Sequence, residues 1–475
     1  MKLTLKPPSL PGYAFDRQVP VFNIYYPMQW DGSSEEAQSN PIEAMREVDI
    51  AEIGSAALYF HFPFCETICN FCPFTRGKFA DREIIPRYLD ALLSEIEQKS
   101  RVFPLHALPV RSIFVGGGTP SLLTADEILR FGDKLKATFD LSRLREFSFE
   151  CEVKSVTRDK VLALREIGVT NARYGLQTFN PYWRDMFDLT ASLDQIYTAN
   201  ELFRSILPRT SFDILYAMDG HTIDDFMADL DEATRIGDLV DVYPIDNVVT
   251  QVKLHGKLIA AGMEPTSANK RFEMNRLLRR RMWENGYLPH NGHGYVRADE
   301  HQLALNPIVS ESYTFEYHNH VYGHADTAVV GFGVNAISIL PRLTLSNTNN
   351  RGRYIEDMLE RDGGTGTQVS RHGPEIDASR PLVTRLPYHG FLEKDRVRWD
   401  EMPTHCLDAL GQFIEAGLVV DRGARYELTM DGWEWYVNMM YYAMPPSQKS
   451  ILDALIMQSL RQPGRRVTAE QVVFQ

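Results

Sequence analysis

Three cysteines lie close together in this chain, at Cys65, Cys69 and Cys72. They follow an apolar run over 58–64 that predicts a strand ending in a loop. Three thiolates at this spacing can ligate three irons of a 4Fe-4S cube and leave the fourth iron open. An open iron can bind and reduce a small molecule, so the spacing predicts reductive chemistry at this loop.

Other arrangements of the cysteines fit the spacing less well. A zinc site usually takes four ligands in two pairs, and this chain has no second CxxC. A ferredoxin-type cluster would need a fourth cysteine from a distant segment. A disulfide framework is atypical of a 475-residue chain with five cysteines, whereas three buried core cysteines remain an alternative. We expect Cys151 to face the layer between barrel and helices, and Cys406 to lie in a terminal helix, neither as a ligand.

The amino-acid composition limits the classes of function that this protein can have. A length of 475 residues predicts two or three domains, and 44% apolar with 24% charged residues is typical of a soluble globular protein. The net charge of −13 argues against a nucleic-acid-binding surface. No apolar run is long enough to span a bilayer, and the N-terminus lacks an apolar signal core. We therefore expect a cytoplasmic protein that binds neither nucleic acid nor membrane.

Strands and helices alternate after an irregular leader that has one short helix over 41–48. The predicted helices include 82–100, 157–167 and 222–236, and Thr124 begins another with a capping box. Two of them are expected to stop at Gly168 and Gly237, because glycine is favoured just after the last residue of a helix. The six predicted strands are 58–62, 112–116, 147–151, 172–177, 211–216 and 239–245.

Six successive βα units predict an α/β fold with a parallel sheet that curls into a partial (β/α)6 barrel, with the helices outside. Active sites of such barrels lie at the carboxyl ends of the strands, so the cysteine loop would lie at that rim. We expect a leader over 1–55, the barrel over 56–250, an extension that completes the active site over 251–365, and a C-terminal domain over 366–475.

The C-terminal part shows a different pattern. A helix over 404–416, two short strands over 418–420 and 426–429, and a final aromatic-rich helix predict a small winged-helix-like unit with a lid or substrate-clamping role. A basic helix over 271–284 precedes it. The glycine-rich segment 361–367 is expected to be a flexible joint.

Polar or glycine residues end several of the predicted strands. The run Gly116–Pro120 contains three glycines, which let backbone approach a ligand and leave N–H and C=O groups available as partners. A sharp strand-to-helix turn is the alternative. Glu150 and Gln177 end the third and fourth strands and Asp213 lies in the fifth, where side chains commonly face a barrel's site. Each alone could equally be a strand-end cap.

These motifs, in this order, resemble those of the radical S-adenosylmethionine (SAM) superfamily, in the branch typified by oxygen-independent coproporphyrinogen III oxidase. The resemblance covers roughly 55–440. It is carried by 58–74, Gly116–Ser121, Phe149-Glu150, 175–180, Asp213–Tyr216 and Gly331–Ser338.

The resemblance implies a 4Fe-4S cluster, one SAM that chelates the open iron, and a second SAM as an option. Reductive cleavage of SAM would give a 5′-deoxyadenosyl radical that abstracts hydrogen. The implied roles are cluster ligation by Cys65, Cys69 and Cys72; SAM contacts by Phe71, Gly117, Gly118, Thr119, Glu150, Gln177 and Asp213; a second SAM site near Ala336 and Ile337; and catalytic or substrate contacts by Tyr59, His318 and His320.

The chain also departs from the family's pattern. An arginine that touches SAM in the family falls near Leu189 here, with Arg184 as a substitute. The segment after the fifth strand reads Tyr216–His221 where the family has a Tyr-Gly-Leu-Pro-Gly-Gln motif. His318–Gly323 is similar to a motif of the related haem chaperones, with Gly323 in place of tryptophan. A hydrogen-bonded loop is the alternative role for His318 and His320.

From these departures we expect a tailoring enzyme that C-methylates or cyclopropanates an aromatic or unsaturated natural product. Tetrapyrrole chemistry (oxidative decarboxylation of coproporphyrinogen III or anaerobic haem ring opening) and a haem-binding chaperone are the alternatives. The expected partners are a small-molecule substrate, a one-electron reductant such as flavodoxin or ferredoxin, and a partner methyltransferase as an option.

Overall fold

The structure is a computed structural model that describes residues 9–10, 13–14, 24–28, 41–245, 252–264, 266–361 and 368–460. Its centre is a twelve-stranded sheet in the order β14-β13-β12-β11-β3-β4-β5-β6-β7-β8-β10-β9. All six predicted barrel strands are confirmed, and each pairs in parallel with the next. They are β3 (Ser55–Phe62), β4 (Val110–Gly117), β5 (Glu146–Cys151), β6 (Asn171–Gln177), β7 (Arg209–Tyr216) and β8 (Leu239–Pro244).

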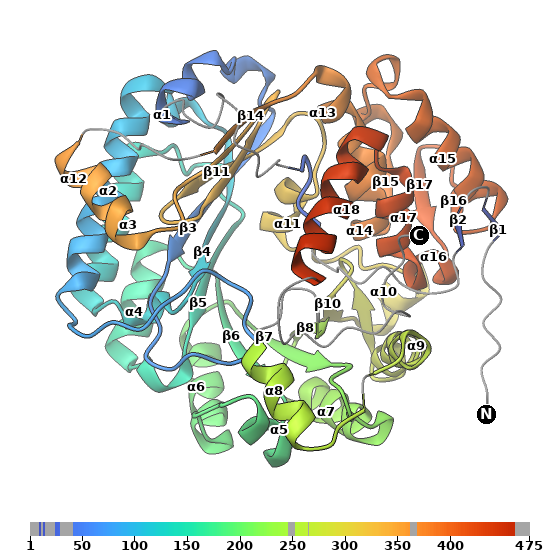
Figure 1. Ribbon diagram of the computed structural model, residues 1–475, viewed down its shortest axis with the longest axis horizontal. Coiled ribbons are helices and arrows are strands. Elements are labelled where there is room, and N and C mark those ends of the chain that lie inside the picture. The colour runs from blue at the N-terminus through green and yellow to red at the C-terminus, as the bar shows by residue number, and fades with distance from the viewer. Residues whose placement is uncertain are drawn as a thin grey trace.

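Helices cover the outer face of this curved sheet, as Figure 1 shows for α2, α3, α4 and α6. Each presents an apolar face to the strands, and together they form one continuous core. The helices of the barrel are α2 (Ile84–Val102), α3 (Ala125–Thr138), α4 (Arg158–Ile167), α5 (Pro181–Met186), α6 (Leu193–Ile206) and α7 (Ile223–Ile236).

The helix ends follow the predicted signals. Thr124 and Glu127 form the expected capping box at α3, and Gly168 ends α4 at φ +102°. Gly237 ends α7 as predicted, with an extended backbone at φ −119°. A Cβ on Gly237 would lie 2.5 Å from the ring of Phe212. Close packing of the helix end against β7 therefore explains this glycine.

The segment after β8 adds strands to both edges of the barrel sheet. At one edge, β9 (Tyr287–Pro289) and β10 (Gly294–Arg297) extend from β8. At the other edge, β11 (Thr327–Phe332) pairs in parallel with β3, and β12 (Ile337–Leu340), β13 (Leu343–Ser346) and β14 (Gln368–Arg371) follow it. The helices of this segment are α8 (Val252–Ala260), α9 (Ala268–Glu284), α10 (Glu300–Leu305), α11 (Glu316–Val321) and α12 (Arg351–Glu360).

The C-terminal part forms a separate helical layer with a small sheet of its own, on the right of Figure 1. The predicted helix–hairpin–helix order is confirmed, and a third strand joins the hairpin. The small sheet contains β15 (Phe391–Glu393), β16 (Val419–Asp421) and β17 (Arg425–Leu428). The helices are α13 (Pro374–Arg380), a π-helical stretch over Pro381–Arg385, α14 (Leu386–His389), α15 (Thr404–Glu415), α16 (Met430–Glu434), α17 (Tyr436–Ala443) and α18 (Pro446–Leu460).

Two predicted features lie at the edges of what the structure covers. In the leader, the predicted helix is present as α1 (Pro41–Ala44) with a 3-10 turn over Met45–Glu47, and β1 (Ser9–Leu10) pairs with β2 (Tyr13–Ala14). Most of the predicted joint, residues 362–367, lies outside the described residues. Within the described part of the chain, no helix is both long and apolar enough to cross a membrane.

Candidate active site at the carboxyl ends of the barrel strands

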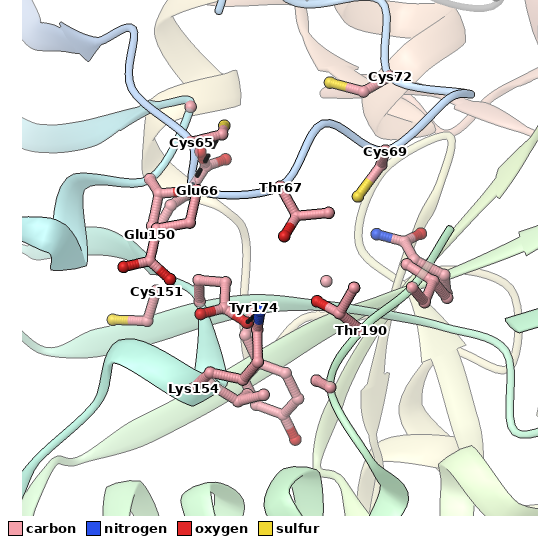
Figure 2. A pocket seen from close by; sticks show the side chains of 18 of the residues that line it. Cys65, Glu66, Thr67, Cys69, Cys72, Glu150, Cys151, Lys154, Tyr174 and Thr190 are labelled. Atoms are coloured by element: carbon pink, nitrogen blue, oxygen red, sulfur yellow. Dashed lines mark hydrogen bonds and ion pairs between the residues drawn. The ribbon is translucent and has the colours of Figure 1, made fainter. Parts of the chain in front are cut away.

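A cavity of about 200 Å³ lies at the carboxyl ends of the barrel strands (Figure 2). It is lined by the cysteine loop after β3, the glycine loop after β4 and the ends of β5, β6 and β7. Ten of the predicted site residues line it together: Cys65, Cys69, Phe71, Cys72, Gly117, Gly118, Thr119, Glu150, Gln177 and Asp213. The parallel sheet brings them together because all its carboxyl ends meet at one rim.

Backbone hydrogen bonds hold the cysteine loop in its shape. The N–H of Cys65 donates to the carbonyl of Gly77 at 3.2 Å, and the N–H of Gly77 donates to Pro63 at 3.0 Å. The guanidinium of Arg76 donates to the carbonyl of Cys69 at 3.3 Å. The loop therefore presents its thiols from a backbone that is already folded.

Burial keeps these thiols protonated in the absence of a metal. It raises the pKa of Cys69 to about 12 and of Cys72 to about 11, and it also raises the pKa of Cys65. The hydroxyl of Thr119 donates to the sulfur of Cys65 at 3.5 Å. Metal binding requires the thiolate, so it must release these protons.

The donor set fits a three-cysteine cluster better than a zinc site. Figure 2 shows Cys65 on one side of a common space and Cys69 and Cys72 on the other. Among the described residues, no three His, Cys, Asp or Glu side chains converge tightly enough to hold one metal ion. Ligands of an iron–sulfur cube bind separate irons, so they need not converge on one point. Three thiols that face one space fit that arrangement.

The other two cysteines are not placed as ligands of the same group. Cys151 is buried in the apolar core and its thiol donates to the carbonyl of Phe149 at 3.8 Å. Although Cys151 also lines the cavity, Figure 2 shows its sulfur directed away from the other three. Cys406 lies in α15, where its thiol donates to the carbonyl of Ala443 at 3.3 Å.

The glycine loop packs against the cysteine loop. Gly117 has φ +111°, and a Cβ there would lie 2.5 Å from the ring of His61; a Cβ on Gly118 would lie 2.6 Å from the carbonyl of Phe64. The N–H of Gly117 donates to Glu150 at 2.9 Å and that of Gly118 to Phe62 at 2.7 Å. Contrary to expectation, both N–H groups are thus already paired. What these glycines can provide to a ligand is therefore space and backbone carbonyl groups.

Gln177 is held in an unusual conformation at the end of β6. Its φ is +74°, and the pairing with β7 shifts register there. Its buried Oε1 has no hydrogen-bond partner among the described residues. An observed strained residue with an unpaired polar atom in a cavity indicates a ligand contact.

The carboxylates of Glu150 and Asp213 are both desolvated. Burial raises the pKa of Glu150, and the bond from Gly117 opposes this effect. Burial also raises the pKa of Asp213 to about 8, although the nearby Arg173 lowers it. Two desolvated acids that face one cavity favour a ligand that carries positive charge or hydrogen-bond donors.

The sequence interpretation missed Arg173, which lines the same cavity. Its guanidinium is buried against the carboxylate of Asp241 on β8 and lies 3.7 Å from Asp213. Its Cζ is 4.5 Å from the centre of the Phe315 ring. Alternate residues of a strand share a face, so position 173 is expected on the same face as position 177. This spacing was the signal in the sequence that could have identified Arg173.

Arg184 lines the cavity as well, but its donors are used by the backbone. Nη1 donates to the carbonyls of Leu176 and Thr178 at 3.1 and 2.9 Å, and Nη2 donates to Ala191 at 2.5 Å. Arg184 thus ties the end of β6 to the loop that carries Leu189, which also lines the cavity. This contact supports a positioning role for Arg184.

Tyr59 does not line this cavity. Its hydroxyl is 2.8 Å from Nδ1 of His61, whose Nε2 donates to the carbonyl of Thr75 at 2.7 Å. Its ring stacks on Phe114, with centroids 5.8 Å apart. Tyr59 therefore contacts the cysteine loop indirectly, through His61.

His318 and His320 also lie away from the cavity, on α11. The ring of His318 is 3.0 Å from the hydroxyl of Tyr388, and burial lowers its pKa well below the usual value. His320 donates to the carbonyl of Glu316 at 2.7 Å, while its Nε2 has no partner among the described residues. The two histidines face different neighbours, so they do not form one pair.

Ala336 lies in the turn between β11 and β12, Ile337 is the first residue of β12, and neither lines the cavity. Ala336 is 1% exposed. The N–H of Gly331 donates to the hydroxyl of Ser338 at 2.9 Å, and Lys99 donates to the carbonyl of Gly331 at 2.5 Å. This buried hairpin accounts for the glycine-rich pattern by packing alone.

Comparison with known protein families matches residues 59–233 to the radical SAM superfamily. The chain is 28% identical to an anaerobilin synthase of Escherichia coli O157:H7 over 55% of this chain and 59% of that protein. It is 29% identical to the heme chaperone HemW of Lactococcus lactis over 37% and 44%. These matches span less than two thirds of either relative.

A third relative matches over more of its length. The oxygen-independent coproporphyrinogen III oxidase of Bradyrhizobium diazoefficiens is 24% identical over 73% of this chain and 72% of that protein. The solved structure of coproporphyrinogen III oxidase (HemN) from Escherichia coli superposes with a TM-score of 0.71 and 20% identity, covering 88% of this chain and 96% of that one. That similarity establishes the fold.

Proposed function

This chain carries a radical SAM domain and has HemN-family homologues, and from that premise we propose that it is a radical SAM enzyme that transforms a tetrapyrrole. The observation that carries the proposal is the convergence of three thiols with Glu150, Gln177 and Asp213 on one cavity. The substrate class rests on the relatives, whose names concern haem, coproporphyrinogen and anaerobilin.

The radical SAM superfamily uses a 4Fe-4S cluster and SAM. Cys65, Cys69 and Cys72 would hold the cluster. The glycine loop, Gln177 and the two acids would hold SAM, whose ammonium and hydroxyl groups suit desolvated carboxylates and an unpaired amide oxygen. When bound, these groups supply one-electron cleavage of SAM and hydrogen abstraction from the substrate.

The chain's own residues orient and shield the reacting groups. Thr119 orients the sulfur of Cys65, and His61 packs beneath Gly117 and joins the cysteine loop to Tyr59. Arg184 fixes the far wall through three carbonyl groups. Arg173 holds Asp213 and Asp241 on one side of the barrel interior. Such pre-formed walls exclude water and hold the substrate for attack.

Methyl transfer or cyclopropanation, the reaction expected from the sequence, has no support in these relatives. Ala336 and Ile337, the residues expected at a second SAM, also lie outside the cavity. A haem chaperone is kept as a second candidate because HemW is among the relatives and because His318–Gly323 resembles the chaperone motif.

The test is anaerobic turnover after cluster reconstitution and chemical reduction. Coproporphyrinogen III and haem are supplied separately with SAM, and 5′-deoxyadenosine and the tetrapyrrole products are quantified by mass spectrometry. We expect 5′-deoxyadenosine with consumption of one tetrapyrrole. Carbon dioxide release would indicate decarboxylation, and a linear product would indicate ring opening.

The other functions give different results in the same assay. Stoichiometric haem binding without consumption would support the chaperone. S-adenosylhomocysteine together with methyl label in a product would support methyl transfer. If a reconstituted cluster yields 5′-deoxyadenosine but neither tetrapyrrole is bound or consumed, the tetrapyrrole proposal is wrong.

A further inference from the structure

Arg279, on α9, is a buried cation that has no hydrogen-bond acceptor among the described residues. The residue is 5% exposed, and none of the described residues accepts a hydrogen bond from its Nε, Nη1 or Nη2. It contacts the faces of two aromatic rings, with Cζ 5.1 Å from the centre of the Trp433 ring and 5.8 Å from that of Tyr436. A buried guanidinium without acceptors is costly, so this one calls for an explanation.

Two other buried arginines donate hydrogen bonds to backbone carbonyls. Arg184 donates to three backbone carbonyls. Arg380 donates to the carbonyls of Thr327 and His320, both at 2.7 Å. The carboxylate of Glu434 interacts with Arg279 electrostatically, but it accepts a hydrogen bond from Arg276 at 2.8 Å. Arg279 therefore differs from Arg184, Arg380 and Arg276, because none of its nitrogens has a hydrogen-bond acceptor among the described residues.

Three more unpaired donors accompany Arg279. Asn275 lies one turn earlier on the same face of α9, and its Nδ2 has no partner among the described residues. The Tyr295 hydroxyl and the Trp433 indole N–H also lack partners there. Tyr295 interacts electrostatically with Arg279, and Trp433 stacks on it. We call Asn275, Arg279, Tyr295 and Trp433 the Arg279 donor cluster.

Consecutive side-chain contacts connect this cluster to the cavity at the carboxyl ends of the barrel strands. Tyr436, which contacts Arg279, has its hydroxyl 3.2 Å from Nε2 of His293. The ring of His293 is 4.7 Å from that of Tyr243 on β8. Tyr243 shares a strand face with Asp241, the partner of the cavity residue Arg173. Aromatic and histidine side chains thus extend from the cavity to Arg279.

We propose that the Arg279 donor cluster binds a carboxylate of the substrate while another part of that substrate reacts in the cavity. A carboxylate supplies acceptors for the guanidinium and for the other unpaired donors, together with a negative charge. The identity of the substrate as a tetrapyrrole with peripheral carboxylates rests on the proposed function. The need for an acceptor at Arg279 does not, because it follows from the guanidinium donors that lack hydrogen-bond partners.

The first experiment measures binding to the reconstituted protein by quenching of tryptophan fluorescence. The probes are coproporphyrin III, which carries free carboxylates, and its tetramethyl ester. We expect Arg279→Met to weaken coproporphyrin III binding roughly 10- to 100-fold and to leave ester binding unchanged. Arg280→Met is the matched control, because Arg280 is on the same helix with its side chain 76% exposed. Unchanged coproporphyrin III binding by Arg279→Met would overturn the proposal.

The second experiment needs no tetrapyrrole. Sodium propionate, at constant ionic strength, should raise the Tm of the wild-type protein and of Arg280→Met but not of Arg279→Met. Without propionate, Arg279→Met should be at least as stable as the wild type, because it removes a buried charge that has no acceptor. A purely structural role for the ring contacts predicts the opposite: a lower Tm in the variant and no effect of propionate on the wild type.

The two experiments separate the two proposals. If the protein binds no tetrapyrrole but propionate stabilises it through Arg279, the carboxylate site stands and the proposed function fails. Arg279→Lys keeps the charge and loses the planar fork, so it provides the same measurements should the methionine variant not fold. We expect its coproporphyrin III affinity to fall between those of the wild type and Arg279→Met.

Discussion

Two groups of polar residues in this molecule differ in how their side chains are paired. The rim group, at the carboxyl ends of the strands, contains the three thiols, Glu150, Gln177 and Asp213 and faces a cavity. The inner group lies between the barrel and the C-terminal helices and contains His293, His318, Tyr388, Tyr436 and Arg279. The inner residues contact one another through rings, and the Arg279 donors find no acceptor among the described residues.

The difference indicates that the two groups have separate roles. The rim residues sit on loops and strand ends next to the cysteines, where they would generate the radical. The inner residues come from the turn between β9 and β10 and from α9, α11, α14 and α17, which meet only in the folded chain. We therefore expect changes in the rim group to affect the cluster and SAM first, and changes in the inner group to affect the substrate first.

The largest effect should come from the thiols. Cys65→Ala, Cys69→Ala and Cys72→Ala should each abolish the visible absorption and iron content of the reconstituted cluster, because three thiolates are the minimum donor set here. Cys151→Ala and Cys406→Ala are the controls and should retain both signals. If an iron–sulfur cluster forms in Cys69→Ala, the assignment of the three thiols as its ligands is wrong.

Glu150→Gln should weaken SAM binding roughly 10- to 100-fold, because an ionised acceptor is lost from a desolvated site. Equilibrium binding to the reconstituted protein measures this effect, and the cluster spectrum should stay unchanged. The control is Glu166→Gln, an exposed carboxylate on α4. Equal SAM affinity in both variants would contradict the assignment of Glu150.

His318→Asn should test the inner group with a smaller effect. It removes the bond to the Tyr388 hydroxyl, and we expect tetrapyrrole binding to weaken about 2- to 10-fold. The formation of 5′-deoxyadenosine without substrate should stay at the wild-type level. A loss of SAM cleavage in this variant would show that the two groups are not separate.

The smallest effect is a pH dependence of stability due to Asp213. Its folded-state pKa of about 8 lies above its ordinary value, so between about pH 4 and pH 8 the unfolded chain binds fewer protons than the folded one. The free energy of unfolding should therefore fall as the pH rises through this window. Urea unfolding at pH 6 and pH 8 should show a smaller fall for Asp213→Asn than for the wild type.

A surface control keeps that comparison specific. Asp238 is half exposed and pairs with Arg204 at 2.8 Å, so Asp238→Asn should retain the wild-type pH dependence. If Asp213→Asn and the wild type lose equal stability between pH 6 and pH 8, Asp213 is not protonated in the folded state.

The amino-acid sequence by itself determined the parts of this protein that depend on local spacing. Short apolar runs with flanking caps were enough to predict β3 to β8, and the spacing of Cys65, Cys69 and Cys72 was enough to predict the cysteine loop. The predicted rim residues were found together because a parallel sheet places the carboxyl ends of its strands at one edge.

Only the tertiary structure decided the rest, because those contacts join segments that are far apart in the sequence. The pairing of β11 with β3, the ion pair of Arg173 with Asp241, and the packing of Gly237 against Phe212 have no local signature. In the sequence, Arg279 is one of several basic residues in a predicted helix. Its lack of an acceptor among the described residues becomes apparent only in the folded structure, where α16 and α17 cover it. The local periodicity of apolar residues predicts strands and helices, whereas the charges that become buried without a partner depend on how distant segments pack together.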